Sequence, residues 1–387
     1  MSELEKLIQE HCPNGVPFKK VSEVANVSIG EFVHKSKQNQ NGKYPVFNGG
    51  TSNTGFYDEY NRTANKIIIS ARGANAGFVN RVFTNYWSGN SCYTIDVVDK
   101  NLNWTFVYYW FKQNEQVLLG EQQKGGIPAV SKKQVENFPI PVPPIEVQSE
   151  IVRILENFTE LTAELTAELT ARKKQYEYYR DELLSLPDVP HMSLSQLTLK
   201  VGSINWKNTN GTRKYIDLSS VDRDTHSIID ADILEVSADN APSRAKQLVK
   251  ENDILFGGTR PMLKRYCIVP VEYDEQVCST GYCVLRVDNK IALTNYVYHC
   301  LGTSEFYRYV EANQQGASYP AIGDKVLKDY EIPVPSLEMQ EKIATVLDRF
   351  NALCNDISAG LPAEIEARQK QYEYYRDKLL TFKEASE

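Results

Sequence analysis

The stretch Gln175-Tyr-Glu-Tyr-Tyr-Arg-Asp181 occurs a second time as Gln371-Tyr-Glu-Tyr-Tyr-Arg-Asp377, 196 residues further along the chain. Upstream of the first copy, Ile140-Pro-Val-Pro143 recurs as Ile332-Pro-Val-Pro335, 192 residues further along. A seven-residue identity at equivalent places in two extended repeats is not a chance match, and internal repeats determine the fold. We therefore expect a globule and a helical segment, followed by a second globule and a second helical segment.

The first helical segment follows the first Pro-rich run. Stepping alternately four and three residues from Ile151 leads to Leu183 mostly through apolar or aromatic positions, which is the seam of a coiled coil. Pro144 is the expected helix start, because proline is favoured in the first turn. Leu161-Thr-Ala-Glu164 is followed by one identical copy and one near-copy, which indicate either a good helix-forming composition or a spacer of defined length.

The second helical segment is expected to start at Ser336, a favoured N-cap residue, with a seam from Ile343. Gly360-Leu361-Pro362 interrupts that seam and predicts a kink or a restart. A single seam is not stable alone in water, so we expect the helices to pair with each other or with partners. If they pair with each other, an antiparallel arrangement closes the chain best and relates the two globules by a pseudo-two-fold axis.

The expected fold class is α+β, with two mixed, mostly β globules joined by two long helices that pair as an antiparallel coiled coil. The domains are expected at residues 1–143 and 188–335 for the globules, and at 144–187 and 336–387 for the central and distal helical regions. The expected strands are Lys66–Ile69, Ser91–Val98, Asp253–Phe256 and Tyr282–Val287, and the expected short helices are Thr105–Lys112 and Thr294–Leu301.

Composition limits the class of protein. The 387 residues include 43 basic and 50 acidic side chains, a net charge of −7, and no segment is strongly basic. If the chain binds DNA, its positive charge must be local, or basic partner subunits must supply the rest. The seven cysteines contain no Cys-x-x-Cys pair, and neither a secretory start nor a long apolar stretch is present. We therefore expect a soluble protein of the cytoplasm.

Sequence motifs of catalysis are missing. The chain contains no P-loop, no Asp/Asn-Pro-Pro-Phe/Tyr motif of a methyltransferase and no Glu-x-Lys pairing of a nuclease. Its five histidines show no metal-ligand spacing. The sequence therefore predicts no catalytic residues, no metal site and no cofactor in this chain.

Cationic and amide side chains in Gly/Asn-rich turns are the candidates for DNA recognition. Arginine and lysine bind guanine edges, asparagine binds adenine, and all of them can hold phosphate. Arg72 and Arg260 stand out, because each follows a matching strand; for any single residue the simpler interpretation is a solvated loop side chain. The candidates are Lys35, Lys37, Asn48, Thr51, Asn53, Arg72, Asn75, Asn80 and Arg81 in the first globule, and Lys207, Asn208, Asn210, Arg213, Arg260, Lys264 and Arg265 in the second.

The repeated signature contains two kinds of position. Tyr176 and Tyr179, with their counterparts Tyr372 and Tyr375, fall on the seam and are expected in the coiled-coil core. The remaining tyrosines and arginines are candidates for docking a partner, because both residue types favour interface centres. These partner-binding candidates are Tyr178, Arg180, Tyr374 and Arg376.

The chain resembles type I restriction–modification specificity subunits over its whole length. The resemblance lies in Cys12-Pro-Asn-Gly-Val16, the Ile-Pro-x-Pro runs, the Leu-Thr-Ala-Glu repeats and the doubled signature. It implies two target-recognition domains that each bind half of a bipartite double-stranded DNA site, with helices that set the spacing and dock methyltransferase subunits. It also implies two methyltransferase and two restriction/translocase subunits, which use S-adenosylmethionine, ATP and magnesium for adenine methylation and restriction.

Gly360-Leu361-Pro362 departs from the family pattern, because it stands where the distal tetrapeptide repeats would be. The two arms are therefore not expected to be strictly symmetric. The alternative interpretation of the chain is a non-enzymatic coiled-coil adaptor, or a decoy that sequesters a methyltransferase partner.

Overall fold

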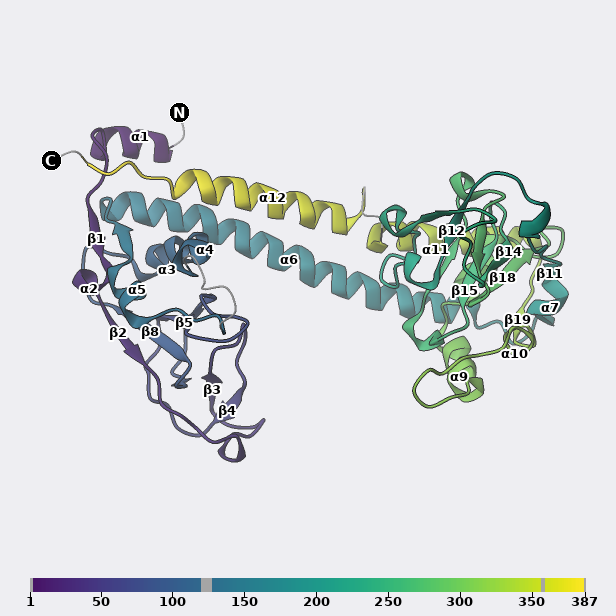
Figure 1. The fold of residues 1–387 in the computed structure, drawn as a ribbon, viewed down its shortest axis with the longest axis horizontal. Helices are drawn as coiled ribbons and strands as arrows, with labels where there is room; N and C mark the ends of the chain where they lie inside the picture. The colour runs from purple at the N-terminus through teal and green to yellow at the C-terminus, as the bar shows by residue number, and fades with distance from the viewer. Residues whose placement is uncertain (1–2, 120–126, 356–358, 386–387) are drawn as a thin grey trace. The chain divides into compact units, whose positions relative to one another are not determined.

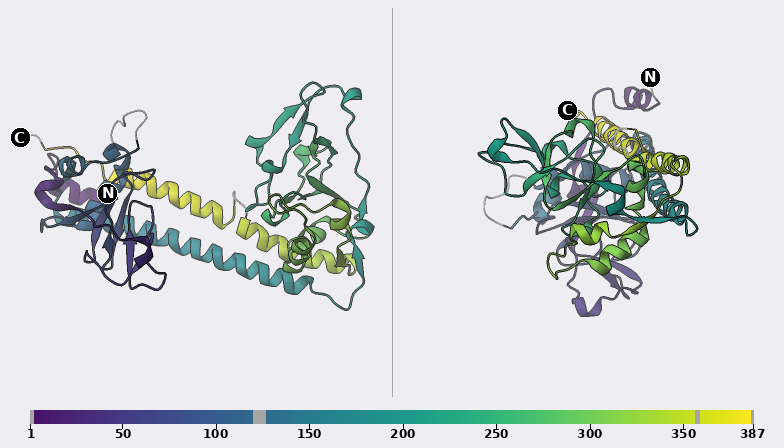
Figure 2. Two further views of the ribbon diagram at one scale, coloured as in Figure 1. Left: turned by 60° about the horizontal axis from the view of Figure 1, so that its bottom comes forward. Right: turned by 90° about the vertical axis from the view of Figure 1, so that its right-hand side faces the viewer.

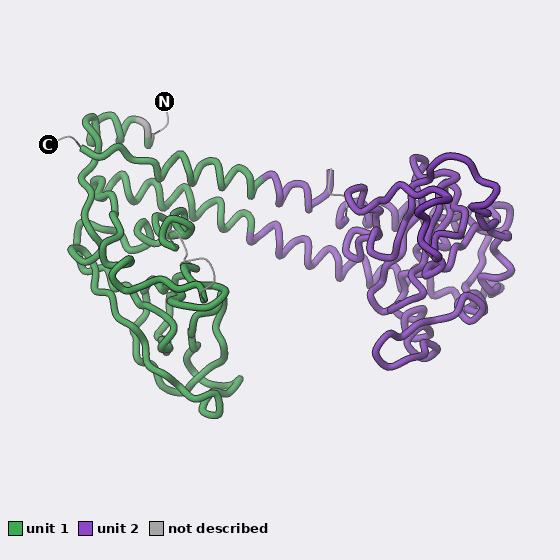
Figure 3. The backbone as a smooth tube through the Cα atoms, in the orientation of Figure 1, with its two compact units in different colours: residues 1–162, 368–387 green, residues 163–367 purple. Residues whose placement is uncertain are grey.

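The computed structural model describes residues 3–119, 127–355 and 359–385. The chain folds into two compact units, coloured separately in Figure 3. Unit 1 joins residues 1–162 to residues 368–387, and unit 2 consists of residues 163–367. The sequence predicted four domains that follow one another along the chain, whereas the two units each combine a globule with parts of the helical regions. The four-domain division stays a prediction.

The centre of unit 1 is a four-stranded antiparallel sheet with the order β2-β8-β5-β6. A three-stranded sheet, β4-β3-β7, and the pair β1-β9 complete the strands, and β3 runs parallel to β7. The strands are β1 Phe18–Lys20, β2 Ala25–Ile29, β3 Tyr44–Phe47, β4 Gly55–Tyr57, β5 Lys66–Ser70, β6 Val79–Val82, β7 Trp87–Ser88, β8 Cys92–Val97 and β9 Pro139–Pro141.

Helices cover the core of unit 1. Asn103 starts α3 by accepting a hydrogen bond from the Thr105 backbone N–H at 2.9 Å. Phe106 on that helix is fully buried in one cluster with Ile67 of β5 and Leu155 of the long helix α6. Each such side chain contributes about 1.5–3 kcal/mol through burial. The short helices are α1 Glu3–His11, α2 Val21–Val24, η1 Lys35–Lys37, α3 Trp104–Gln113, α4 Glu115–Leu119 and α5 Lys132–Asn137.

The two ends of the described chain meet within unit 1 (Figure 1). The Val16 backbone N–H donates to the Lys383 carbonyl at 2.9 Å, and the Ala385 N–H donates to the Val16 carbonyl at 3.0 Å. Leu380 is buried in the same core cluster as Phe106. The last residues that the structure describes are therefore part of the N-terminal globule.

The strands of unit 2 repeat this order. Its central sheet has the order β11-β18-β15-β16, and a second sheet, β13-β12-β17-β14, contains the parallel pair β12-β17. The pair β10-β19 corresponds to β1-β9. The strands are β10 His191–Ser193, β11 Thr198–Leu199, β12 Arg213–Ile216, β13 Leu234–Val236, β14 Ala245–Leu248, β15 Ile254–Gly257, β16 Tyr266–Ile268, β17 Val277–Ser279, β18 Tyr282–Val287 and β19 Glu331–Pro333.

The core of unit 2 is aromatic. Phe256, Tyr296 and Phe306 are fully buried, and they share a cluster with Leu347 of helix α11. These large rings bury more apolar surface per residue than the aliphatic side chains around them. The short helices are α7 Leu194–Leu197, η2 Trp206–Asn208, η3 Leu218–Ser220, η4 Asp230–Asp232, η5 Pro261–Leu263, η6 Val271–Tyr273, α8 Thr294–Cys300, α9 Ser304–Asn313 and α10 Asp324–Lys328.

The long helix α6 runs without interruption from Ile145 to Leu184, over 40 residues (Figure 1). It begins at Ile145, one residue after the predicted start at Pro144. The distal segment instead consists of α11 (Leu337–Asn355) and α12 (Leu361–Leu379). The restart predicted at Gly360-Leu361-Pro362 is confirmed, because α12 begins within that tripeptide.

Within each unit, α6 lies beside part of the distal segment (Figures 1 and 2). In unit 1 the rings of Phe158 and Tyr375 stack with centroids 5.3 Å apart. In unit 2 the rings of Tyr179 and Phe350 lie 6.0 Å apart. The two phenylalanines and the two tyrosines are counterparts in the sequence repeat, so the same aromatic pair occurs once in each unit.

A buried glutamine fixes the start of the helix in each unit. The fully buried Gln148 donates to the Asn101 and Pro143 carbonyls at 2.8 and 2.7 Å and accepts from the Asn103 N–H at 2.8 Å. Gln340 makes the same three kinds of bond, to the Ile291 and Pro335 carbonyls at 3.2 and 2.9 Å and from the Leu293 N–H at 2.9 Å. This buried amide explains why glutamine follows both Pro-rich runs.

The predicted strands and short helices are confirmed within a residue or two by β5, β8, β15, β18, α3 and α8. The mixed α and β content of the fold is confirmed as well. The smaller sheets and the 3-10 segments were not predicted, because their strands are short and pair with segments distant in the sequence.

Candidate nucleic-acid interface

Arg72 follows β5, the strand in the third position of the central sheet of unit 1. Its side chain is exposed, and its Nη2 donates to the Asn90 carbonyl at 3.3 Å. Its backbone forms a bridge with Ala129. Gly73 follows with φ of +92°, a conformation that glycine adopts without strain. This turn presents a cation at the surface, beside the end of a buried strand.

Arg260 has the matching position in unit 2, after β15 in the third position of the corresponding sheet. Its neighbour Thr259 bridges to Ala321, which is the repeat counterpart of Ala129. The Arg260 guanidinium lies 4.3 Å from the ring centre of Tyr319, a side chain that is 69% exposed. Stacking on an exposed ring orders a planar donor group that suits a base edge or a phosphate.

The other candidates of unit 1 lie on several segments. Asn80 donates to the Thr51 carbonyl at 3.4 Å, and Asn48 accepts from the Ser91 N–H at 3.1 Å, so these residues hold turns together. The side chains of Lys35, Lys37, Asn48, Thr51 and Asn75 are exposed, whereas Asn53, Asn80 and Arg81 are partly buried. The lysines belong to η1, a segment apart from the Arg72 turn.

Arg81 is placed as a structural residue. Its guanidinium pairs with Glu156 of α6 and lies 4.7 Å from the ring centre of Tyr108, 5.3 Å from that of Tyr109 and 5.0 Å from that of Phe83. Its side chain is 13% exposed. These contacts leave little of the guanidinium accessible to DNA, so Arg81 is the weakest of the predicted contacts.

The candidates of unit 2 form two groups. Lys207 and Asn208 lie on η2, Arg213 starts β12, and Asn210 lies between these two elements. The first two and Asn210 are exposed. Arg260, Lys264 and Arg265 surround η5. Arg260 and Lys264 have φ of +50° and +55°, a left-handed conformation that costs energy for a non-glycine residue. The Lys264 ammonium lies 4.7 Å from the ring centre of Tyr307.

The family model for the type I restriction modification DNA specificity domain matches the chain twice, at residues 13–172 and 195–367. The chain belongs to the type I restriction–modification specificity family. The EcoR124I/EcoR124II specificity subunit of Escherichia coli is 34% identical over 300 residues, which cover 72% of this chain and 70% of that protein.

Two further members of the specificity family cover nearly the whole chain. A Haemophilus influenzae relative, named a type I restriction enzyme specificity subunit, is 28% identical over 98% of both chains. The crystal structure of the type I restriction–modification S subunit of M. genitalium superposes with a TM-score of 0.60 at 18% identity. It covers 95% of this chain and 97% of its own, which shows a shared fold.

In this member of the specificity family, Tyr176 of the first signature begins a series of hydrogen bonds that runs from a buried contact with His299 to the partly exposed Asp348. Its hydroxyl lies 3.0 Å from His299 Nδ1, and His299 Nε2 lies 2.7 Å from a carboxylate oxygen of Asp348. Burial would raise the pKa of Asp348, but hydrogen bonds from His299 and Asn295 outweigh burial and the pKa is lowered. These hydrogen bonds connect α6, α8 and α11, and they were not predicted from the sequence.

Unit 1 contains a shorter version of the same contact. The Tyr109 hydroxyl donates to Glu156 at 3.2 Å. Glu156 and Asp348 are 192 residues apart, the offset that also relates the two Pro-rich runs. Aligning the acidic residues of the two repeats was therefore the signal that could have located both sites.

The partner-binding candidates differ in exposure. Tyr178 and Tyr374 are 61% and 63% exposed. Arg180 is 7% exposed, because its guanidinium lies over the Tyr176 ring and beside Asp181. The side chain of Arg376 is 24% exposed and pairs with Asp377 at 2.7 Å. Tyr178 and Tyr374 thus present similar surfaces, whereas Arg180 is part of the interior of unit 2; partner binding by all four stays a prediction.

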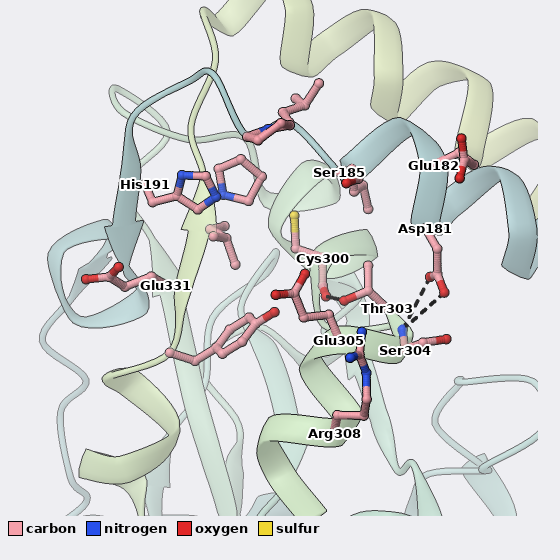
Figure 4. Close-up of a pocket in the computed structure, with 16 residues that line it drawn as sticks. Asp181, Glu182, Ser185, His191, Cys300, Thr303, Ser304, Glu305, Arg308 and Glu331 are labelled. Carbon is pink, nitrogen blue, oxygen red and sulfur yellow. Dashed lines mark hydrogen bonds between the residues drawn. The ribbon is translucent and has the colours of Figure 1, made fainter.

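An acidic pocket of about 510 Å³ lies at the end of α6 in unit 2 (Figure 4). Asp181 of the signature accepts hydrogen bonds from the Ser304 N–H at 3.3 and 3.4 Å, at the N-terminus of α9. The carboxylates of Glu182, Glu305 and Glu331 also line it. Four carboxylates against the single guanidinium of Arg308 make the pocket unfavourable for a phosphate. Asp181 joins α6 to α9 by satisfying a helix N-terminus.

Among the described residues, no group of three or more His, Cys, Asp or Glu side chains is arranged to hold a metal ion. Within the same residues, no helix combines the length and the apolar character needed to cross a membrane.

Proposed function

We propose that this chain is the DNA-sequence specificity subunit of a type I restriction–modification complex, and that each globule binds one half of a bipartite DNA site. The observation that carries the proposal is duplication. The DNA specificity domain matches twice, and each match contains a four-stranded sheet of the same order with an exposed arginine after its third strand. Two similar heads suit a ligand that presents two half-sites.

The helices are proposed to form an antiparallel coiled coil that sets the spacing of the half-sites and docks methyltransferase subunits. A helix of 40 residues such as α6 spans about 60 Å. The Phe–Tyr contact in each unit supports pairing of α6 with the distal segment. The Leu-Thr-Ala-Glu repeats lie within α6, where a change in their number alters its length.

Catalysis is proposed to belong to partners. Two methyltransferase subunits and two restriction/translocase subunits would use S-adenosylmethionine, ATP and magnesium in the cytoplasm. The relatives support this assignment, because they are named as specificity subunits of type I restriction enzymes. The net charge of −7 also favours partners that supply basic surface to the DNA.

Methylome sequencing of the host with and without this gene tests the proposal. We expect adenine methylation at one bipartite motif to disappear when the gene is removed. Arg260→Ala should weaken or relax only the half-site that unit 2 binds. An unchanged methylome would contradict a specificity role, and a gain of methylation after removal of the gene would indicate a decoy.

A further inference from the structure

Unit 2 contains a second pocket, of about 210 Å³, whose charge is opposite to that of the acidic pocket. Its lining includes Lys173 and Arg180 of α6, together with Arg223 and Lys264. Two carboxylates, Glu177 and Asp224, also belong to the lining, so the cations exceed the carboxylates. A local cationic excess in an acidic chain needs an explanation.

Two of these cations lack a carboxylate partner. Within the described residues, Lys173 and Lys264 form no ion pair, whereas Arg180 pairs with Asp181 at 3.3 Å and Arg223 with Asp224 at 3.8 Å. Lys264 is exposed at the end of η5, and its ammonium remains over the ring of Tyr307. The entrance of the pocket therefore presents positive charge that the protein does not neutralise.

Polar atoms inside the pocket also lack partners. The Tyr307 side chain is 6% exposed, and its hydroxyl has no hydrogen-bond partner in the part of the chain that the structure describes. The same holds for Nδ1 of His226, whose pKa burial lowers to about 4. Buried polar atoms are nearly always satisfied, so an unpaired hydroxyl that lines a pocket indicates a missing ligand or water.

The chemistry of the lining selects an oxyanion. A hydroxyl can donate one hydrogen bond, and two ammonium groups can each donate more, which suits the several acceptor oxygens of a phosphate group. An anion beside His226 would also favour the imidazolium, in which both ring nitrogens donate. Gly302 leaves room for two side chains of the lining, since a Cβ there would lie 2.9 Å from Arg180 Nη1 and 2.9 Å from the Tyr266 hydroxyl.

We propose that this cationic pocket binds a phosphate group of the DNA backbone beside the half-site that unit 2 reads. The inference rests on the proposed function, because it requires unit 2 to contact DNA. Lys264 belongs to the same η5 segment as the candidate base-contacting residue Arg260. A phosphate held here would position unit 2 on the duplex and would carry no sequence information itself. It would also join α6, through Lys173, directly to the DNA backbone.

Duplex DNA scanned with single neutral methylphosphonates tests the pocket, in the chain assembled with its methyltransferase subunits. Neutralising one position near the unit 2 half-site should weaken wild-type binding about tenfold. Tyr307→Phe and Lys264→Gln should each weaken binding of unmodified duplex by a similar factor, without altering sequence preference. Neutralising the same phosphate position should not weaken the binding of either variant further. Lys290→Gln, which removes an exposed cation outside the pocket, is the matched control and should bind like the wild type.

Each other outcome overturns the proposal in a distinguishable way. The pocket is excluded, and the proposed function stands, if Tyr307→Phe and Lys264→Gln bind unmodified duplex as tightly as the wild type. The same conclusion follows if both variants are as sensitive as the wild type to a methylphosphonate at every position scanned. Failure of the wild type and Lys290→Gln to bind any duplex would overturn the proposed function and the pocket together. Protection of unit 2 from thermal unfolding by inorganic phosphate, lost in Tyr307→Phe while DNA binding is unchanged, would assign the pocket to a free phosphate. Because the Tyr307 hydroxyl has no partner, Tyr307→Phe should not lower the melting temperature of the free chain.

Discussion

Replacing Arg81 with alanine should destabilise unit 1, whereas replacing Arg72 should weaken DNA binding and leave stability unchanged. Both arginines lie in the first globule and both were candidates for DNA contact. They differ in surroundings, because Arg81 is enclosed by Glu156 and three aromatic rings, while Arg72 is exposed. The pair of variants therefore separates a structural arginine from a recognition arginine.

The expected magnitude follows from the contacts of Arg81. The ion pair is worth at most about 1 kcal/mol, because Glu156 is 41% exposed and solvent screens it. Three ring contacts at a mostly buried guanidinium contribute about 1–2 kcal/mol. The loss is then on the order of 2–3 kcal/mol, which corresponds to a fall in melting temperature of about 4–12 °C for a unit of this size. Arg72→Ala should change stability by less than about 0.5 kcal/mol.

Hydrogen exchange resolved along the chain is the suitable assay, because two units need not unfold as one transition. Arg81→Ala should accelerate exchange in β5, β6 and α3 without altering β15 or α8. A double-mutant cycle with Glu156→Gln should give a coupling energy above the experimental error. The reasoning is refuted if Arg81→Ala keeps its protection and loses DNA binding, or if Arg72→Ala loses protection.

Three further outcomes are expected. Gln148→Met and Gln340→Met each remove three hydrogen bonds from a buried amide. Each should destabilise its own unit by about 2–4 kcal/mol in hydrogen exchange. A single variant that destabilises both units equally would contradict this expectation. Deleting Leu165–Glu168 removes about 6 Å of helix, so methylome sequencing should show a shorter spacer with both half-sites unchanged, and altered half-sites would contradict it. Burial lowers the pKa of His226 to about 4. Since the unfolded chain then takes up the proton at higher pH than the folded chain, unit 2 should lose on the order of 3 kcal/mol as the pH falls from about 6.5 to about 4. His226→Asn, which suits the φ of +55°, should remove this loss, and an unchanged acid profile would rule out the assignment.

The periodicity of apolar residues was sufficient to predict the helices and the central strands, because their buried faces appear in the local sequence pattern. The strand at Lys66–Ser70 is a run of β-branched residues, and α6 follows a continuous apolar seam. The smaller sheets depend on pairing between distant segments: β3 pairs in parallel with β7, and β12 with β17. Nothing in the local pattern of those short strands specifies the partner, so the sequence alone could not predict them.

The candidate site was predictable in part. The exposed positions of Arg72 and Arg260 after matching buried strands could be read from the repeat, and their contact with DNA stays a prediction. Arg81 was misleading, since it looks like a turn residue but lies on β6, where an acidic partner 75 residues away encloses it. Arg180 was misleading for a related reason. A helical seam predicts the direction of a side chain relative to its own helix. It does not predict which part of the globule covers that side chain, because this depends on the tertiary fold.

The two copies of the signature differ in which of their residues are exposed, and this difference indicates which residues a partner can contact. In the first copy Arg180 is buried in unit 2, while in the second Arg376 is partly exposed beside Asp377. Tyr178 and Tyr374, by contrast, are equally exposed, and each packs against the tyrosine that follows it in the sequence. A partner present in two identical copies requires the same surface twice. We therefore expect Tyr178→Ala and Tyr374→Ala each to weaken methyltransferase docking at one position, whereas Arg180→Ala should act first on the stability of unit 2. Titration of methyltransferase against the chain by native mass spectrometry should show loss of one bound copy for each tyrosine variant, and retention of both copies in the two variants would contradict the expectation.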